Sequence, residues 1–152
     1  MKAAIWILAA WSFAAAAENK PNFSGEWKMN TAESALGPVP VPLSLVRRVI
    51  HSDPSLAITE EQKGGSGDHV VVRHYTTDGK QVTFQEDGAN VVATAVWDGD
   101  ALVIKAKADT GGIVIAFVET MTLSNKNRTL TDHLHVVTPQ GEVDATYSFE
   151  KQ

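Results

Sequence analysis

The sequence predicts an all-β protein, an antiparallel up-and-down meander of about ten strands that closes into a barrel. Asp-Gly pairs at residues 78–79, 87–88 and 98–99, together with other clusters of Gly, Pro, Ser and Asn, recur roughly every 10 to 12 residues. Asp-Gly suits the positive φ angles of tight hairpin turns. The intervening runs are rich in β-branched and apolar residues and contain no amphipathic helix, which is typical of a meander and not of alternating strands and helices.

The strands lie between these turns, and every connection except the first can be a local hairpin. The first connection, residues 30–42, contains a stretch able to form one helical turn, residues 31–36, followed by Gly37-Pro38-Val39-Pro40-Val41-Pro42. The prolines require an extended path, so we expect this segment to cross one barrel end as a lid. The predicted strands cover residues 23–29, 45–51, 56–62, 69–76, 80–86, 90–97, 101–108, 113–123, 128–137 and 142–150.

One face of this sheet is apolar, because apolar residues recur at every second position and their neighbours are polar. Without helices to cover that face, the sheet can curl into a barrel or fold into two stacked layers. Closure also removes exposed strand edges, so we expect the barrel. The residues expected to point inward are Leu56, Ile58, Val82, Phe84, Leu102, Ile104, Ile113, Ile115, Phe117, Met121, Leu123, Val143, Tyr147 and Phe149.

Residues 1–17 predict a cleavable signal peptide. Lys2 supplies the positive start, residues 3–14 form a short apolar run, and Ala15-Ala16-Ala17 offers a small-residue cleavage site. The run is too short to span a bilayer, which takes about 20 residues, and no later segment is long and apolar enough. We therefore expect residues 18–152 to form one exported domain, periplasmic or extracellular, without an integral membrane segment.

Composition limits the chemistry of this domain. The chain has no cysteine, which excludes disulfides, thiol catalysis and acylation of a lipoprotein anchor. Without Lys2, 12 basic residues face 18 acidic ones, a net charge of −6. That balance disfavours nucleic acid and anionic membranes as partners, and we expect a monomer that needs no cofactor.

The most specific motif is Phe23-Ser24-Gly25-Glu26-Trp27 on the first predicted strand. Its Gly-x-Trp resembles the signature of the lipocalin and calycin superfamily, and the resemblance implies that Trp27 packs across the closed base of a barrel. The chain lacks the long helix that lipocalins carry after the barrel, and ten strands are closer in number to the fatty-acid-binding branch. The chain is also similar to small exported bacterial proteins of unassigned role that begin this way and end in a Phe-Glu-Lys strand, here residues 149–151. That likeness implies no activity.

Several charged and polar residues share strand faces with the expected core. Charges inside a barrel need partners, so they either pair with one another, Arg73 with Glu60 first, or lie at open rims. Alternatively, Arg73 and Tyr75 point together and bind the polar head of an amphipathic ligand. The expected inward polar residues are Glu60, Arg73, Tyr75, Glu119, Asp132 and Tyr147, joined by either Arg47 or Arg48.

Small inward residues bear on whether the barrel is hollow. Ala93, Ala95, Ala106 and Ala145 either fit a tapering, filled barrel or leave volume for a ligand. The leading hypothesis is a barrel that binds a small apolar or amphipathic molecule. Its candidate ligand-binding residues are Arg73, Tyr75, Glu60, Tyr147 and Phe117, and its fold-signature residues are Gly25 and Trp27.

Two alternatives remain open from the sequence. The first is a cell-envelope interaction module with a filled barrel and no small-molecule ligand. The second is a metal-binding module, since His133 and His135 lie two apart on one strand and share a face, with His74 as a possible third ligand; solvent-exposed histidines explain the same pattern. No sequence motif for hydrolase, phosphate-loop or zinc-protease chemistry occurs, so enzyme activity is not expected.

Overall fold

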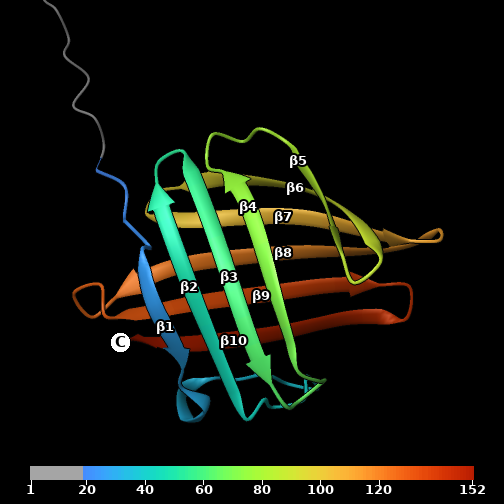
Figure 1. The fold of residues 1–152 in the computed structure, drawn as a ribbon, viewed down its shortest axis with the longest axis horizontal. Coiled ribbons are helices and arrows are strands. Elements are labelled where there is room, and N and C mark those ends of the chain that lie inside the picture. Colours follow the sequence, from blue (N-terminus) through green and yellow to red (C-terminus); the bar gives the residue numbers. More distant parts are fainter. Residues whose placement is uncertain (1–18) are drawn as a thin grey trace, which may run out of the picture.

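The computed structural model describes residues 19–152, and they form one ten-stranded antiparallel sheet without an α-helix (Figure 1). The predicted meander is confirmed, and each predicted strand is present with its bounds shifted by at most two residues. The expected signal peptide, residues 1–17, lies outside the described residues. In chain order the strands are β1 (Gly25–Met29), β2 (Ser44–Ser52), β3 (Ser55–Lys63), β4 (His69–Thr76), β5 (Val82–Glu86), β6 (Ala89–Asp98), β7 (Ala101–Thr110), β8 (Ile113–Ser124), β9 (Thr129–Thr138) and β10 (Gly141–Lys151).

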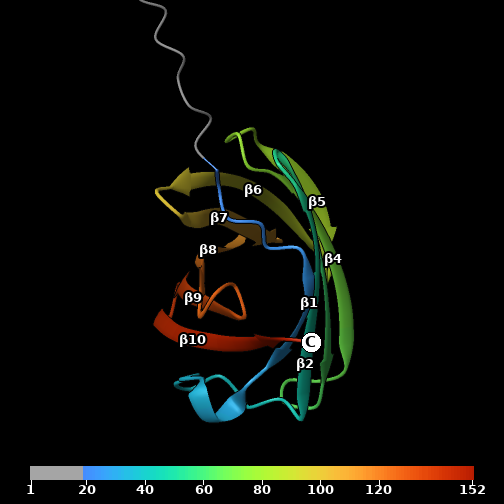
Figure 2. The ribbon, with the colours of Figure 1, turned by 90° about the vertical axis from the view of Figure 1, so that its left-hand side faces the viewer.

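The sheet wraps into a nearly closed barrel. Each strand except β4 pairs with the next along the chain, and β1 also pairs with β10, so the spatial order runs β4-β3-β2-β1-β10-β9-β8-β7-β6-β5. Figures 1 and 2 show β1 to β4 crossing over the layer formed by β6 to β10. The two edges, β4 and β5, lie beside each other without a shared hydrogen-bond ladder. Among residues 19–152 no helix is long and apolar enough to cross a membrane.

The first connection covers part of one barrel end. Only Thr31–Glu33 is helical, as the short 3₁₀ helix η1, because Ser34 is already extended and Ala35 forms a β-bridge with Thr146 of β10. The chain then runs to the β3–β4 turn, where the Leu43 N–H donates to the Lys63 carbonyl at 2.8 Å. Gly64 in this turn has φ +69° and leaves no room for a side chain, since a Cβ would lie 2.7 Å from Cγ of Leu43.

The opposite end is filled by a dry aromatic and aliphatic core. Trp27 is 0% exposed, and its indole Nε1–H donates to the Phe23 carbonyl at 2.9 Å. Gly25 adopts φ +145°, a conformation that side chains rarely tolerate, which explains the glycine of Gly-x-Trp. The core position expected for Trp27 is confirmed. The largest buried apolar side chains are Phe23, Trp27, Leu56, Leu102, Ile104, Met121, Leu130 and Phe149.

The prediction that Ile113 points inward is wrong. Ile113 is 57% exposed, although it has the same parity on β8 as the inward-facing Ile115 and Phe117. The reason is its position beside the Gly111-Gly112 turn, at the tip of the β7–β8 hairpin, which projects past the barrel wall (Figure 1). Alternation identifies the face of a strand but not where the barrel ends.

We predict that Trp27→Ala lowers the free energy of unfolding by about 3–5 kcal/mol, because it removes a fully buried ring and its hydrogen bond to Phe23. Urea unfolding followed by far-UV circular dichroism measures this. Ile50→Thr is the control, since Ile50 is 74% exposed and threonine keeps the β-branched shape. A loss for Trp27→Ala no larger than for Ile50→Thr contradicts the assigned role of Trp27.

Candidate functional site

The half of the barrel away from Trp27 is hollow. It encloses a cavity of about 400 Å³ lined by residues from β2 to β10. The lining reaches the exposed residues Asp87 and Thr110, in the β5–β6 turn and at the end of β7, so the cavity meets the surface there. Apolar side chains form much of its wall, among them Leu45, Phe84, Val91, Ile115, Phe117 and Leu134.

All five residues predicted to bind a ligand line this one cavity. They come from β3, β4, β8 and β10, and the closure of the sheet brings them together. Their role in binding stays a prediction. These residues are Glu60, Arg73, Tyr75, Phe117 and Tyr147.

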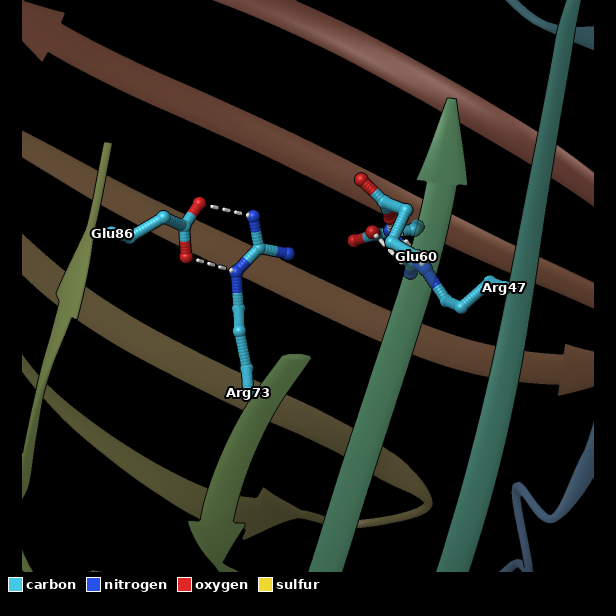
Figure 3. A network of polar contacts seen from close by, with 5 residues as sticks. Arg47, Glu60, Arg73 and Glu86 are labelled. Carbon is cyan, nitrogen blue, oxygen red and sulfur yellow. Dashed lines mark hydrogen bonds and ion pairs between the residues drawn. The ribbon is translucent and has the colours of Figure 1, made fainter. Parts of the chain in front are cut away.

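Arg47 occupies the centre of the polar part of the wall. It is the inward member of the Arg47-Arg48 pair, and the strand register places it directly opposite Glu60. Its Nε and Nη2 donate to Oε2 of Glu60 at 3.0 and 2.7 Å (Figure 3), and its Nη1 donates to Oδ2 of Asp132 at 2.8 Å. The guanidinium also lies 4.7 Å from the ring centre of Phe149, where cation–π attraction adds to its fixation.

Arg73 forms the second ion pair, and it joins the two edges of the sheet. From β4 its Nε and Nη2 donate to Oε2 and Oε1 of Glu86 on β5 at 2.7 and 2.6 Å, a bidentate pair (Figure 3). The expected pair of Arg73 with Glu60 is therefore wrong. Glu60 is taken by Arg47 across the β2–β3 ladder, whereas Arg73 lies opposite Ile58 and reaches over the unpaired edge.

Glu86 was not singled out from the sequence. The signal was available, because Glu86 continues the period-two pattern of Val82 and Phe84 and so had to point inward. Arg47 was named only as an alternative to Arg48. The structure resolves that alternative, since Arg48 is exposed and pairs with Glu26 outside the barrel.

The ion pairs set the charge states of the cavity wall. Burial alone would raise the pKa of Glu60, but the charges of Arg47 and Arg73 outweigh it and hold that pKa below its usual value. Burial lowers the pKa of Arg47, yet the charges of Glu60 and Asp132 raise it by more, so the guanidinium stays charged. Burial also raises the pKa of Tyr75, which keeps the phenol neutral at physiological pH.

Glu119 and Asp132 form a second kind of pair, two carboxyl groups close together. Glu119 lies opposite Leu134 and Asp132 opposite Met121 in the β8–β9 ladder, so the two acids are diagonal neighbours on the inward face. Burial raises the pKa of Glu119 to about 7, and the charge of Asp132 adds to the rise. Burial raises the pKa of Asp132 as well, although Arg47 offsets part of the effect.

The two histidines named as weak metal candidates lie on the outside of β9. His133 Nδ1 is 2.8 Å from the Thr146 hydroxyl, and His135 Nδ1 is 2.7 Å from Oδ1 of Asp144, both across the β9–β10 pair. Within residues 19–152 no group of three or more His, Cys, Asp or Glu side chains is arranged to hold a metal ion. The hydrogen-bond partners on β10, Thr146 and Asp144, account for the orientation of His133 and His135.

No protein-family model and no curated protein matches the sequence. Solved structures do match the fold. Zebrafish ileal bile acid-binding protein complexed with cholic acid superimposes with a TM-score of 0.63 at 16% identity, covering 86% of this chain and 98% of that one. Secretory abundant heat soluble protein 4 from Ramazzottius varieornatus gives 0.59 at 12% identity over 86% and 94% of the two chains. Human cRBP IV gives 0.56 at 13% identity over 87% and 99%. The calycin-like barrel that the sequence resembles is thereby confirmed as the fold.

We predict that Arg47→Met lowers the free energy of unfolding by about 3–5 kcal/mol at pH 7, because Glu60 and Asp132 are left buried without their counter-charge. The loss should shrink towards pH 4, where the unpaired carboxylates take up protons. Urea unfolding at several pH values tests both points. The control is Arg48→Met, one residue along the same strand on the outer face, for which little change is expected. Equal losses in the two variants contradict the role given to Arg47.

Glu119 should make stability depend on pH. Its pKa is about 7 in the folded protein against about 4.3 in an unfolded chain, so the folded state binds more protons between these values. The stability that Glu119 contributes is fully present below its pKa in the unfolded chain, and it is lost as the pH rises through its pKa in the folded protein. A glutamine does not ionise, so Glu119→Gln does not lose this stability. As the pH rises from 4.5 to about 8, the free energy of unfolding of the variant should therefore increase relative to that of the wild type by on the order of 3 kcal/mol.

Urea unfolding of both proteins across this range measures that difference. Glu61→Gln is the matched control, because Glu61 lies on the outer face of β3 beside Arg48 and Lys63. A difference between Glu119→Gln and wild type that stays constant with pH would show that Glu119 titrates at its ordinary value.

Proposed function

We propose that this protein binds one small apolar or amphipathic molecule inside the barrel. The observation that carries the proposal is the cavity of about 400 Å³, which combines an apolar wall with a small set of fixed polar groups. Ligand sites are typically concave, largely apolar pockets of about 300–1,000 Å³ with few polar groups. The zebrafish neighbour, whose structure contains cholic acid, uses the same fold.

The cavity favours this function over an interaction module with a filled barrel. Protein interiors are packed densely, with few voids larger than a water molecule. A space of about 400 Å³ exceeds such packing defects by more than an order of magnitude. Since the base around Trp27 is filled, the hollow half is a separate feature and not a sign of loose packing throughout.

In this proposal Phe117 contacts the apolar part of the ligand, and Glu60, Arg73, Tyr75 and Tyr147 surround its polar end. We also propose that the mature protein acts outside the cytoplasm after residues 1–17 are removed. The start of the sequence supports this, with its positive residue, short apolar run and small-residue site in the order of a signal peptide.

Filling the cavity should abolish binding. Ala106 lines the cavity from β7, so we predict that Ala106→Phe lowers the affinity for the neutral fluorescent probe N-phenyl-1-naphthylamine at least about tenfold, because the ring occupies the ligand's volume. Fluorescence titration measures the affinity. Ala116→Phe is the control, because Ala116 pairs with Lys107 and Val137 on the outer face of the neighbouring strand. Wild-type protein that does not bind the probe, or equal binding by both variants, counts against a ligand in the cavity.

A further inference from the structure

We infer that the ligand carries a protonated amine as its head group, and that this cation binds between the carboxyl groups of Glu119 and Asp132 at the floor of the cavity. The inference rests on the proposed function, because it names the class of molecule that the cavity takes. Four features of the described residues support it: the charge balance of the wall, an unpartnered acceptor, the geometry of the acid pair and the polarity of the cavity from floor to mouth.

The charge balance of the wall disfavours an anionic head group. The lining contains two guanidinium groups and five carboxyl groups, and neither lysine nor histidine. Both guanidinium groups are committed, Arg47 to Glu60 and Asp132, and Arg73 bidentately to Glu86. A ligand carboxylate would add a sixth acidic group to a wall that holds only two guanidinium groups, both already ion-paired.

Asp132 presents an acceptor that no protein group satisfies. The residue is 1% exposed, and its Oδ2 accepts from Arg47, but its Oδ1 has no hydrogen-bond partner. Buried acceptors are nearly always hydrogen-bonded in folded proteins, so an isolated one calls for a partner. Asp132 lines the cavity, so the carboxyl group that carries this acceptor belongs to the wall that a bound molecule contacts.

Glu119 stands next to this acceptor, and the two acids share one inward face. Burial and the neighbouring acid raise the pKa of Glu119, which means that a second negative charge beside Asp132 is disfavoured although Arg47 already pairs with Asp132. An ammonium group brings up to three N–H donors and one positive charge. It therefore satisfies Oδ1 of Asp132 and replaces the proton that Glu119 otherwise holds.

The position of the pair along the strands orients the ligand. Along β8 the inward residues run from Ile115 and Phe117, which line the cavity, through Glu119 to Met121 in the dry core. Glu119 therefore lies at the floor of the cavity, where the hollow half meets the filled half. An amine head placed there lets an apolar tail lie along Phe117 and Ile115 toward the mouth.

Three ligands with the same ten-carbon chain test the inference. Decylamine, decanol and decanoate are cationic, neutral and anionic at pH 7.5, and each can be titrated by displacing N-phenyl-1-naphthylamine from the wild-type protein. We expect decylamine to bind at least about tenfold more tightly than decanol, and decanoate to bind most weakly, because charge-assisted hydrogen bonds are the stronger kind.

Two variants locate the head group. Glu119→Gln and Asp132→Asn keep the size of each side chain but remove its negative charge. Either should lower the affinity for decylamine about tenfold and leave the affinity for decanol nearly unchanged, which also shows that the variant is folded. Glu61→Gln on the outer face should change neither affinity.

The outcomes separate this inference from the proposed function. If decanol or decanoate binds as tightly as decylamine, or if Glu119→Gln leaves amine binding intact, the cationic head group is wrong while the ligand-binding barrel stands. If none of the three displaces the probe although the probe binds, the inference is likewise overturned. If the probe itself does not bind, the proposed function fails as well.

Discussion

The ion pairs of Arg47 with Glu60 and Asp132 are the interaction on which the interior of this barrel depends. Arg47 is buried at the level where the dry core around Phe149 gives way to the cavity. A guanidinium without carboxylates could not stay there, and the carboxylates could not stay without it, because buried charges need close counter-charges. The register of β2 against β3, which places Arg47 opposite Glu60, is therefore part of the chemistry of the site.

The seam of the barrel follows the same logic. Neighbouring strands elsewhere share backbone ladders, whereas β4 and β5 are held by side chains, chiefly the bidentate pair of Arg73 and Glu86. Side-chain contacts give less protection than a continuous ladder, so we expect the seam to open at a lower free energy than the parts of the wall that have ladders. The same arginine faces the cavity, which couples closure of the seam to the charge balance inside.

Most of the fold could be predicted from local signals, and the errors arise where distant strands meet. Asp-Gly turns and period-two alternation belong to single hairpins, so the ten strands and their inward faces follow from the sequence directly. The partner of Arg73 does not, because Glu86 becomes its neighbour only after the sheet has curled and its edges have met. The exposure of Ile113 was missed for a related reason, since the length by which a hairpin passes the barrel wall depends on the other strands.

Whether the barrel is filled or hollow could not be predicted either, because the same residue type serves both halves. Ala93 and Ala145 are buried in the core, while Ala106 lines the cavity. What differs is the surrounding wall: the core alanines belong to a cluster of large apolar side chains, whereas the wall around Ala106 includes carboxyl groups such as Glu119. Carboxyl groups cannot be packed dry against apolar side chains without a large desolvation cost. The polar floor and the empty space above it thus belong together, since the acids of the floor are the groups that the proposed ligand would satisfy.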